Sequence, residues 1–348
     1  MTAVGTALVD IDEIRDAARR IAGVVVRTPL LASPWPGLWL KPEMLQPIGA
    51  FKIRGAMTAM SRLSPETRAR GVLAHSSGNH AQAVAYAARA FGVPAHIVIP
   101  DNAPARKVEA TRALGATVEL VPVEQRFSRP AELAALTGKA MIAPYDDRNV
   151  IAGQGTIGLE IAEDLELMAV GMAGGLAGGV AGGLASGMAG GLSTVLVPVS
   201  GGGLISGVAA ALAALAPEVK VIGVEPALAG DAADSFSAGE RRAWLPADTA
   251  RTIADGLRTF SVGELPWQHI RTQVHDIITV TEDEILDATR RLALEARLVA
   301  EPSGAVATAG FLHHRSQMPA GNAVAIVSGG NIDPEIFRMI LEGSSVRD

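Results

Sequence analysis

The chain lacks cysteine altogether and has few aromatic residues. Its 348 residues contain no cysteine, and only 4% are Phe, Trp or Tyr. Without cysteine the chain cannot form a disulfide, a cysteine-ligated zinc or iron–sulfur centre, or a thiol nucleophile. Because disulfides are rare in reducing compartments, we expect a cytoplasmic protein.

Basic residues are scarce at the N-terminus and outnumbered in the whole chain. No Lys or Arg precedes Arg15, whereas a secretory signal needs a basic start before its apolar core. The 30 Lys and Arg against 36 Asp and Glu give a net charge of −6. We therefore expect no binding to nucleic acid or to anionic lipid. A helix opened by Asp10, with Glu13 three residues later as a capping box, is expected near the start.

One long stretch, 167–217, has no charged residue and contains a four-residue Gly/Ala repeat at 172–192. A hydropathy scan would mark it as a membrane span, but glycine is a poor helix former and we expect no membrane segment. A small-residue helix that packs against a partner subunit is a second interpretation. We favour a low-complexity surface insertion at about 168–192.

Short β-branched runs alternate with helical patterns over most of the chain. Strands are expected at 72–75, 96–100, 117–122, 141–143, 194–199, 219–225, 277–280 and 323–328. Helices are expected between them, at 81–91, 105–114, 156–165, 204–215 and 282–296. This alternation is typical of an α/β fold with parallel or mixed twisted sheets flanked by helices. Ligands of such folds bind at the carboxyl ends of the strands.

The first motif surrounds one of only five lysines. Lys52 lies between Phe51 and Ile53 in the segment 50–55. Apolar surroundings lower the pKa of an amine, which suits Schiff-base chemistry. Taken alone, such a segment is more often the start of an amphipathic helix with a solvated lysine.

Two further motifs follow expected strands and open expected helices. In 75–81 the polar residues Ser77, Asn79 and His80 lie where backbone amides converge on an anion such as a carboxylate. The segment 197–207 contains Ser200 followed by three consecutive glycines, and predicts a phosphate cradle of backbone amides. Its glycine spacing, with a later strand that ends in Glu225, is also similar to a dinucleotide-binding fingerprint.

A fourth motif, a strand that ends in Ser328 and two glycines, is by itself only a turn. Together and in this order, the four motifs resemble the threonine/serine dehydratase and serine racemase family of pyridoxal-phosphate enzymes. Further matching stretches are 27–30, 41–46, 152–157, 252–256, 280–285 and 301–305. The resemblance covers about 11–334 apart from the repeat, and it outweighs the dinucleotide interpretation.

The resemblance implies a two-lobed fold type II (tryptophan-synthase-β-like) enzyme. Residues 1–69 and 149–348 would form the large domain that binds the cofactor, and 70–148 a small mobile domain. The family's members are usually homodimers. We therefore expect a homodimer that acts on a small amino acid.

The resemblance also implies roles for single residues. Lys52 matches the lysine that binds pyridoxal phosphate as a Schiff base and removes the α-proton. Phe51 matches the aromatic residue beside the cofactor, Asn79 the partner of its phenolic oxygen, and Ser328 the residue that faces its ring nitrogen. The cofactor phosphate is expected at Ser200, Gly201, Gly202, Gly203 and Leu204, although Ser200 departs from the family's four-glycine pattern. The substrate is expected at Ser76, Ser77, Gly78, Asn79 and His80.

The reaction implied is β-elimination. A hydroxyl at Ser328 does not hold the ring nitrogen protonated as an aspartate would, so the ring is a weaker electron sink and expulsion of a β-leaving group is favoured. The expected function is therefore a threonine/serine ammonia-lyase. Ser77 matches the second catalytic residue of the family's racemases, so a serine racemase with side elimination is an alternative. A 3-hydroxyaspartate ammonia-lyase is another.

A metal site is implied at Glu225, Ala229 and Asp231, as two carboxylates and one backbone carbonyl. Oxygen ligands of this kind suit Mg²⁺, Mn²⁺ or Ca²⁺, whereas spacing alone would indicate only a solvated acidic turn. The residues that select the substrate side chain are not readable from the motifs. Thr259 and either Arg126 or Arg129 are candidates by position.

Overall fold

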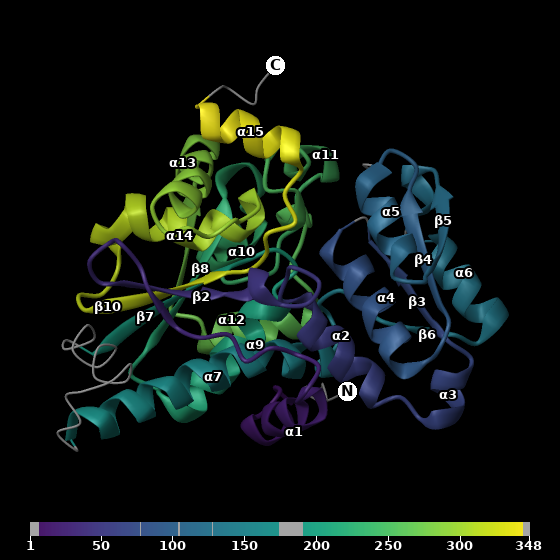
Figure 1. Ribbon diagram of the computed structural model, residues 1–348, viewed down its shortest axis with the longest axis horizontal. Coiled ribbons are helices and arrows are strands. Elements are labelled where there is room, and N and C mark those ends of the chain that lie inside the picture. The colour runs from purple at the N-terminus through teal and green to yellow at the C-terminus, as the bar shows by residue number, and fades with distance from the viewer. Residues whose placement is uncertain (1–6, 77, 104, 127, 174–190, 344–348) are drawn as a thin grey trace.

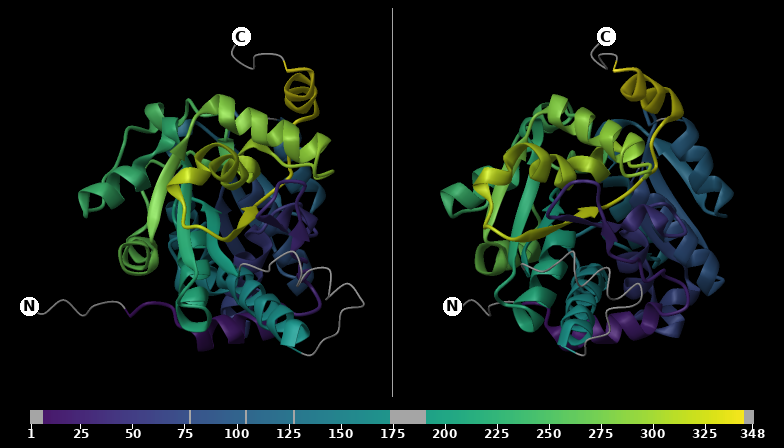
Figure 2. Two further views of the ribbon diagram at one scale, coloured as in Figure 1. Left: turned by 90° about the vertical axis from the view of Figure 1, so that its left-hand side faces the viewer. Right: turned by 60° about the vertical axis from the view of Figure 1, so that its left-hand side comes forward.

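The chain folds around two separate β-sheets (Figure 1). The computed structural model describes residues 7–76, 78–103, 105–126, 128–173 and 191–343, without the side chains of 168–173. Two further views show the larger sheet edge-on, with helices on both of its faces (Figure 2). The α/β fold with parallel and mixed sheets flanked by helices is therefore confirmed.

The larger sheet has six strands in the order β1-β2-β10-β7-β8-β9. They are β1 (Leu31–Ala32), β2 (Leu38–Pro42), β7 (Leu192–Pro198), β8 (Lys220–Pro226), β9 (Asp276–Val280) and β10 (Asn322–Val327). Only the β1–β2 pair is antiparallel. The four parallel pairs align the carboxyl ends of β2, β10, β7, β8 and β9 along one edge, where ligands bind in such sheets.

The smaller sheet has four parallel strands in the order β5-β4-β3-β6. They are β3 (Val72–His75), β4 (Ala95–Pro100), β5 (Thr117–Val121) and β6 (Ala140–Met141). All four come from 72–141, inside the segment expected to form the small domain. The domain boundaries and the mobility of that segment stay predictions.

Helices cover both sheets. Below the large sheet in Figure 1 lie α1 (Ile11–Ile21), α2 (Lys52–Ser61), α7 (Arg148–Ala173), α9 (Gly203–Leu215) and α12 (Glu264–Gln273). Above it lie α10 (Asp231–Ala238), α11 (Pro246–Thr249), α13 (Glu282–Leu294), α14 (Pro302–His314) and α15 (Pro334–Glu342). Beside the small sheet lie α3 (Pro65–Ala69), α4 (Asn79–Phe91), α5 (Ala105–Ala113) and α6 (Ser128–Thr137).

The contact between α7 and α9 depends on small residues. A Cβ on Gly158 would lie 2.8 Å from the Val208 carbonyl oxygen, and one on Gly155 3.0 Å from that of Gly207. The first distance is shorter than side chains tolerate and the second is at the limit, so glycine lets the two backbones approach. This contact holds the first half of α9, which follows the glycine-rich segment, close against α7.

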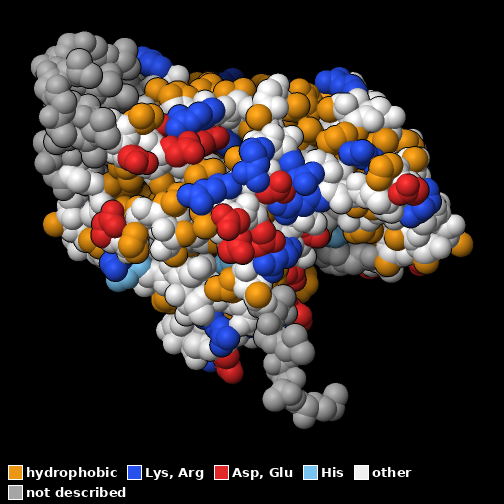
Figure 3. All heavy atoms as spheres, turned by 90° about the horizontal axis from the view of Figure 1, so that it is seen from below, with side chains coloured by type: hydrophobic (Ala, Val, Ile, Leu, Met, Phe, Trp, Pro, Cys, Tyr) orange, Lys and Arg blue, Asp and Glu red, His pale blue; other side chains and the backbone are white. Residues whose placement is uncertain are grey.

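The expected start of the chain is confirmed. Asp10 accepts a hydrogen bond from the Glu13 backbone amide, and the Glu13 carboxylate accepts one from the Asp10 amide, so the capping box is present. On the face seen from below, acidic and basic side chains are interspersed among apolar ones (Figure 3). In the part of the chain that the structure describes, no helix is long and apolar enough to cross a membrane.

Candidate active site

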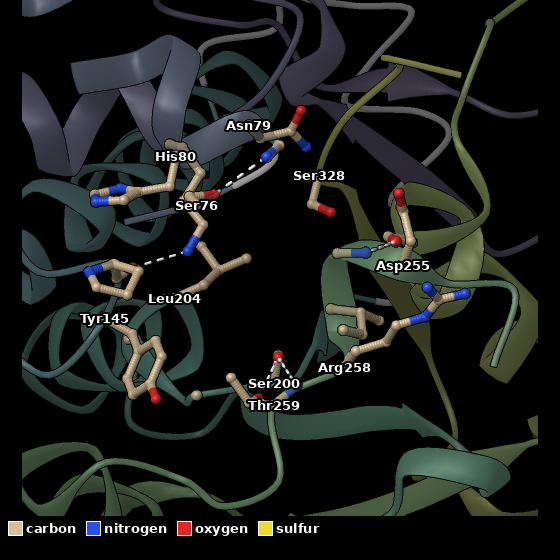
Figure 4. Close-up of a pocket in the computed structure, with 18 of the residues that line it drawn as sticks. Ser76, Asn79, His80, Tyr145, Ser200, Leu204, Asp255, Arg258, Thr259 and Ser328 are labelled. Atoms are coloured by element: carbon tan, nitrogen blue, oxygen red, sulfur yellow. Dashed lines mark hydrogen bonds between the residues drawn. The ribbon is translucent and has the colours of Figure 1, made fainter. Parts of the chain in front are cut away.

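All four sequence motifs line one pocket (Figure 4). The pocket lies where the carboxyl ends of β3, β7 and β10 meet the start of α2. Its lining includes Phe51, Lys52, Ser76, Gly78, Asn79, His80, Ser200, Gly201, Gly202, Gly203, Leu204 and Ser328. Ser77 lies outside the described residues. The fold thus brings together residues from distant parts of the chain.

Lys52 is the first residue of α2, and its amine is desolvated. The Nζ atom donates a hydrogen bond to the Pro144 carbonyl, at 2.8 Å, and lies 5.1 Å from the centre of the Phe51 ring. Burial lowers the pKa of Lys52 to about 8. An amine with such a pKa is partly neutral at physiological pH, so it can form a Schiff base and accept a proton.

The loop between β7 and α9 has room only for glycine. Gly202 has a φ of +88°, and a Cβ on Gly201 would overlap the Tyr145 ring. A Cβ on Gly203 would lie 2.9 Å from the Tyr145 Cα. The loop ends at the N-terminus of α9, where unpaired backbone amides favour an anion. This cradle therefore fits a phosphate group.

Ser200 is held by the neighbouring loop. Its hydroxyl forms a hydrogen bond with the Thr259 hydroxyl and accepts one from the Thr259 amide at 3.4 Å. Figure 4 shows this pair at one edge of the pocket and Tyr145 at another. The serine that replaces the first glycine of the family's pattern thus connects the loop to Thr259.

Asn79 and Ser328 lie together on another side of the pocket (Figure 4). Asn79 begins α4, and its Nδ2 donates to the Glu301 Oε1 at 2.6 Å. Ser328 is buried directly after β10, and its carbonyl accepts from the Phe51 amide at 3.0 Å. This backbone hydrogen bond holds Ser328 next to the segment that contains Lys52.

His80 is buried and uncharged. Burial, and then the nearby charge of Lys52, lower the pKa of His80 to about 3. Its Nε2 lies 2.9 Å from the Ile142 carbonyl, which only accepts hydrogen bonds, so Nε2 is the donor. Nearby, the Ser76 hydroxyl accepts a hydrogen bond from the Gly78 amide at 3.2 Å. The assignment of these residues to substrate binding stays a prediction.

Several lining residues were not identified from the sequence. Tyr145, Asp255, Arg258 and Glu301 all line the pocket. Glu301 and Asp255 fall in stretches that match the family, but nothing in their spacing indicated a contact with Asn79 or Lys107. Thr259 and Arg126 also line the pocket. Arg129 instead donates to the Glu119 carboxylate at 2.6 Å, so it is the weaker of the two arginine candidates.

The residues of the expected metal site lie outside this pocket. Glu225 is the penultimate residue of β8 and Asp231 begins α10, and both are fully buried, as is Ala229 between them. Glu225 Oε2 accepts from the Ala233 amide at 2.8 Å, whereas Glu225 Oε1 and both Asp231 oxygens have no hydrogen-bond partner in the described structure. Burial and the neighbouring charge raise the pKa of Glu225 well above its usual range, and burial raises that of Asp231 to about 7.

Two buried, unsatisfied carboxyl groups side by side fit a divalent cation, which would neutralise both and supply the missing partners. Among the residues that the structure describes, no three or more His, Asp or Glu side chains gather into a metal-binding group. The site expected here contains only two such side chains and one carbonyl.

Comparisons with known proteins identify the family. A family model described as "pyridoxal-phosphate dependent enzyme" matches residues 21–329. The chain is 38% identical over 339 residues to the L-threo-3-hydroxyaspartate ammonia-lyase of Saccharomyces cerevisiae, covering 95% of this chain and 96% of that protein. It is 38% identical over 350 residues to the L-threonine ammonia-lyase of Thermotoga maritima, covering 98% and 80%.

Solved structures agree with the sequence relatives. The structure of maize serine racemase superposes with a TM-score of 0.83 at 37% identity, covering 97% of this chain and 98% of that one. The structure of a threonine deaminase from T.th. gives a TM-score of 0.81 at 40% identity, covering 93% and 99%. The pocket contains both a desolvated lysine and a glycine-rich phosphate cradle, and the chain shares its fold with a threonine deaminase and a serine racemase. The chain belongs to the pyridoxal-phosphate-dependent enzymes of fold type II, in the family of the threonine/serine ammonia-lyases and serine racemases.

Proposed function

We propose that this enzyme is a threonine/serine ammonia-lyase, which converts L-threonine or L-serine to an α-keto acid and ammonia. The observation that carries the proposal is the presence of the Lys52 amine and the Ser328 hydroxyl in one pocket, on two segments that a backbone hydrogen bond joins. Phe51 would contact the ring of the bound cofactor, and Gly201, Gly202, Gly203 and Leu204 its phosphate.

Pyridoxal phosphate, when bound, withdraws electrons from the substrate Cα and so acidifies its hydrogen. Lys52 Nζ is the group that takes this proton, since burial has lowered its pKa. The Ser328 hydroxyl does not keep the ring nitrogen protonated. Departure of the β-hydroxyl then relieves the negative charge at Cα. The loop 76–80 would bind the substrate carboxylate and keep water out.

One observation favours a second substrate. Arg126 and Arg258 line the same pocket, as does Lys107, which is paired with Asp255. Basic side chains suit a second carboxylate, so the 3-hydroxyaspartate ammonia-lyase activity of relatives in yeast and Pseudomonas sp is the second candidate. The serine racemase alternative rests on Ser77 in the sequence and on the relatives of that name.

The test measures several products in one reaction. Holoenzyme with Mg²⁺ is given L-threonine, L-serine or L-threo-3-hydroxyaspartate, keto acid release is followed, and D-serine is assayed by chiral chromatography. Keto acid from L-threonine or L-serine as the main product supports the proposal. D-serine formed as fast as pyruvate, and lost in Ser77→Ala, would instead make the enzyme a racemase. Preference for hydroxyaspartate, reduced in Arg258→Gln, would establish the second candidate.

We further propose that Glu225, the Ala229 carbonyl and Asp231 bind a divalent cation, because one oxygen of the Glu225 carboxylate and both of the Asp231 carboxylate lack partners among the described residues. The cation would support the fold rather than take part in the chemistry, since these residues do not line the pocket. We also propose a cytoplasmic homodimer, as is usual in the family. Analytical ultracentrifugation of the holoenzyme would test the dimer, and a sedimenting species of monomer mass would contradict it.

A further inference from the structure

Glu301 is a buried carboxylate beside the pocket with no assigned role. It immediately precedes α14 and is only 3% exposed. Its amide donates to the Gly329 carbonyl at 3.1 Å, and a Cβ on Gly329 would overlap its Oε1. The glycine that follows Ser328 thus makes room for the Glu301 carboxylate. A buried acid placed against the pocket wall in this way requires an explanation.

The carboxylate contacts the amide of Asn79. Asn79 Nδ2 donates to Glu301 Oε1 at 2.6 Å. At its other end, Asn79 Oδ1 accepts from Asn331 Nδ2 at 2.7 Å, and Asn331 Nδ2 also donates to the Ile48 carbonyl at 2.8 Å. Because the Ile48 carbonyl only accepts, it fixes the orientation of the Asn331 amide, which in turn fixes that of Asn79.

This chain of hydrogen bonds determines what Asn79 offers to the pocket. An Asn amide nitrogen carries two hydrogens, and Glu301 uses one of them. The second remains for a group in the pocket that Asn79 lines. An ionised carboxylate can only accept, so it holds the Asn79 nitrogen in place. A protonated carboxyl is a weaker acceptor, so it holds the Asn79 nitrogen less firmly, although Asn331 still determines which end of the amide faces it.

Burial and the surrounding charges bring the pKa of Glu301 close to neutral pH. Burial, and then the charge of Asp255 on the 3₁₀ turn Asp255–Leu257, raise the pKa of Glu301 to about 7. The hydrogen bond from Asn79 on α4 and the charge of Lys107 on α5 act in the opposite direction. Lys107 and Asp255 also form an ion pair with each other. The N-terminus of α14 further favours the ionised form.

We propose that Glu301 is a positioning residue that acts through Asn79, and that its proton controls how Asn79 meets the phenolic oxygen of the bound cofactor. When Glu301 is ionised, Asn79 presents an N–H to that oxygen. When Glu301 gains a proton, this hydrogen bond weakens and the electron distribution of the cofactor changes. The inference rests on the proposed function, because the role of Asn79 towards the cofactor is itself proposed.

The experiment titrates the visible absorbance of the substrate-free holoenzyme with pH. The wild-type enzyme is expected to show a spectral transition near neutral pH. Glu301→Gln is expected to lose that transition while it retains the cofactor band, since the amide still accepts from Asn79 but cannot ionise. Glu282→Gln is the matched control: Glu282 is also buried at the start of a helix, and the transition of this variant should match the wild type.

Two neighbours give a test that does not depend on the Glu301 variant. Asp255→Asn removes a charge that raises the pKa of Glu301, so the transition should move to lower pH. Lys107→Met removes a charge that lowers it, so the transition should move to higher pH. An unchanged transition in Glu301→Gln, or shifts of the same sign in both neighbours, would overturn the inference.

The result also separates this inference from the proposed function. If keto acid forms but the spectral transition is unchanged in Glu301→Gln, the proposed ammonia-lyase activity stands and only the positioning role of Glu301 is contradicted. A wild-type protein with no cofactor band and no keto acid would contradict both.

Discussion

Two regions around the six-stranded sheet bury charge in opposite ways. At the end of β2, four charged residues pair with one another: Arg54 contacts Glu43 at 2.8 Å and Glu160 at 2.6 Å, and Lys41 contacts Glu160 at 2.7 Å. Burial alone would raise the pKa of Glu43, but Arg54 and Lys41 hold it below its usual range. The charges of this network compensate one another.

Around the pocket and at the end of β8, buried groups lack such partners. Lys52 donates to a neutral carbonyl, Glu301 accepts from a neutral amide, and the Asp231 oxygens meet no hydrogen-bond donor among the described residues. Their pKa values all move towards neutrality. Buried charges that pair with one another thus have a structural role. Buried ionisable groups without an oppositely charged partner are instead those expected to exchange a proton or to bind a ligand.

The largest effect is expected at Lys52. Lys52→Ala removes the group placed to take the α-proton, so kcat should fall by about 10²- to 10⁴-fold or more. Lys52→Arg keeps a charge but cannot form a Schiff base, and should be equally inactive. Keto acid release and the visible cofactor band report both losses. A variant with more than about a tenth of wild-type activity would remove Lys52 from the mechanism.

The next largest effect is expected in the paired network. Arg54→Met leaves Glu43 and Glu160 without their shared cation, and breaking a buried pair in this way typically destabilises a protein by about 3–5 kcal/mol. Urea denaturation of wild-type and variant protein measures the loss. A loss below about 1 kcal/mol would mean that the network contributes no more to the free energy of unfolding than an exposed ion pair does.

A smaller effect, with a defined sign, is expected at Glu225 and Asp231. The pKa of Asp231 is about 7 in the folded protein and about 4 in an unfolded chain. The folded form therefore binds the proton more tightly, so this group's contribution to the stability of metal-free protein should be fully present below about pH 4 and decline up to about pH 7. Thermal denaturation against pH measures this decline.

A divalent cation should reverse that decline. At about 100 times its Kd, a bound Mg²⁺, Mn²⁺ or Ca²⁺ adds about 2.7 kcal/mol to stability. Glu225→Gln should lose the response to cations, yet it should not destabilise the metal-free protein, because glutamine still accepts from the Ala233 amide and lacks a carboxyl group whose ionised form burial disfavours. Equal cation responses in wild type and variant would show that the metal binds elsewhere.

The smallest effect is expected at Arg27, the matched control for Arg54. Both arginines pair with acids on α7, but the Arg27 side chain is 46% exposed and that of Arg54 fully buried. Arg27→Gln should therefore change stability by less than about 1 kcal/mol. The same urea denaturation checks it, and a loss as large as that of Arg54→Met would contradict the distinction between paired burial and surface pairing.

The sequence predicted most of the fold because its strands are short apolar runs between glycine-rich turns. The strand at 72–75 has the predicted bounds, and the other expected strands lie within a few residues of theirs. β1 and β2 were not predicted, since β2 contains Lys41 and Pro42, which rarely occur in buried strands. α7 was expected over 156–165 and extends from Arg148 to Ala173, into the start of the expected insertion. The rest of the Gly/Ala repeat, 174–190, lies outside the described residues.

The pocket was predictable where its residues occur in motifs and not where they come singly from distant loops. Lys52, Asn79 and the glycine loop occur in recognisable patterns. Glu301 and Tyr145 reach the pocket only through the packing of α14 and of the segment before α7. The stretches 27–30 and 41–46 matched the family, but their shared part in the ionic network with Arg54 appears only in three dimensions.

The most direct test asks which lysine holds the cofactor. Lys41 and Lys52 lie close in the sequence and burial lowers the pKa of both, but Lys41 is paired with Glu160, whereas Lys52 donates to a neutral carbonyl. Holoenzyme is reduced with borohydride to fix the Schiff base, digested, and mapped by mass spectrometry. We expect a pyridoxyl group on Lys52 and none on Lys41. A pyridoxyl group on Lys41, or on no lysine of the chain, would contradict it.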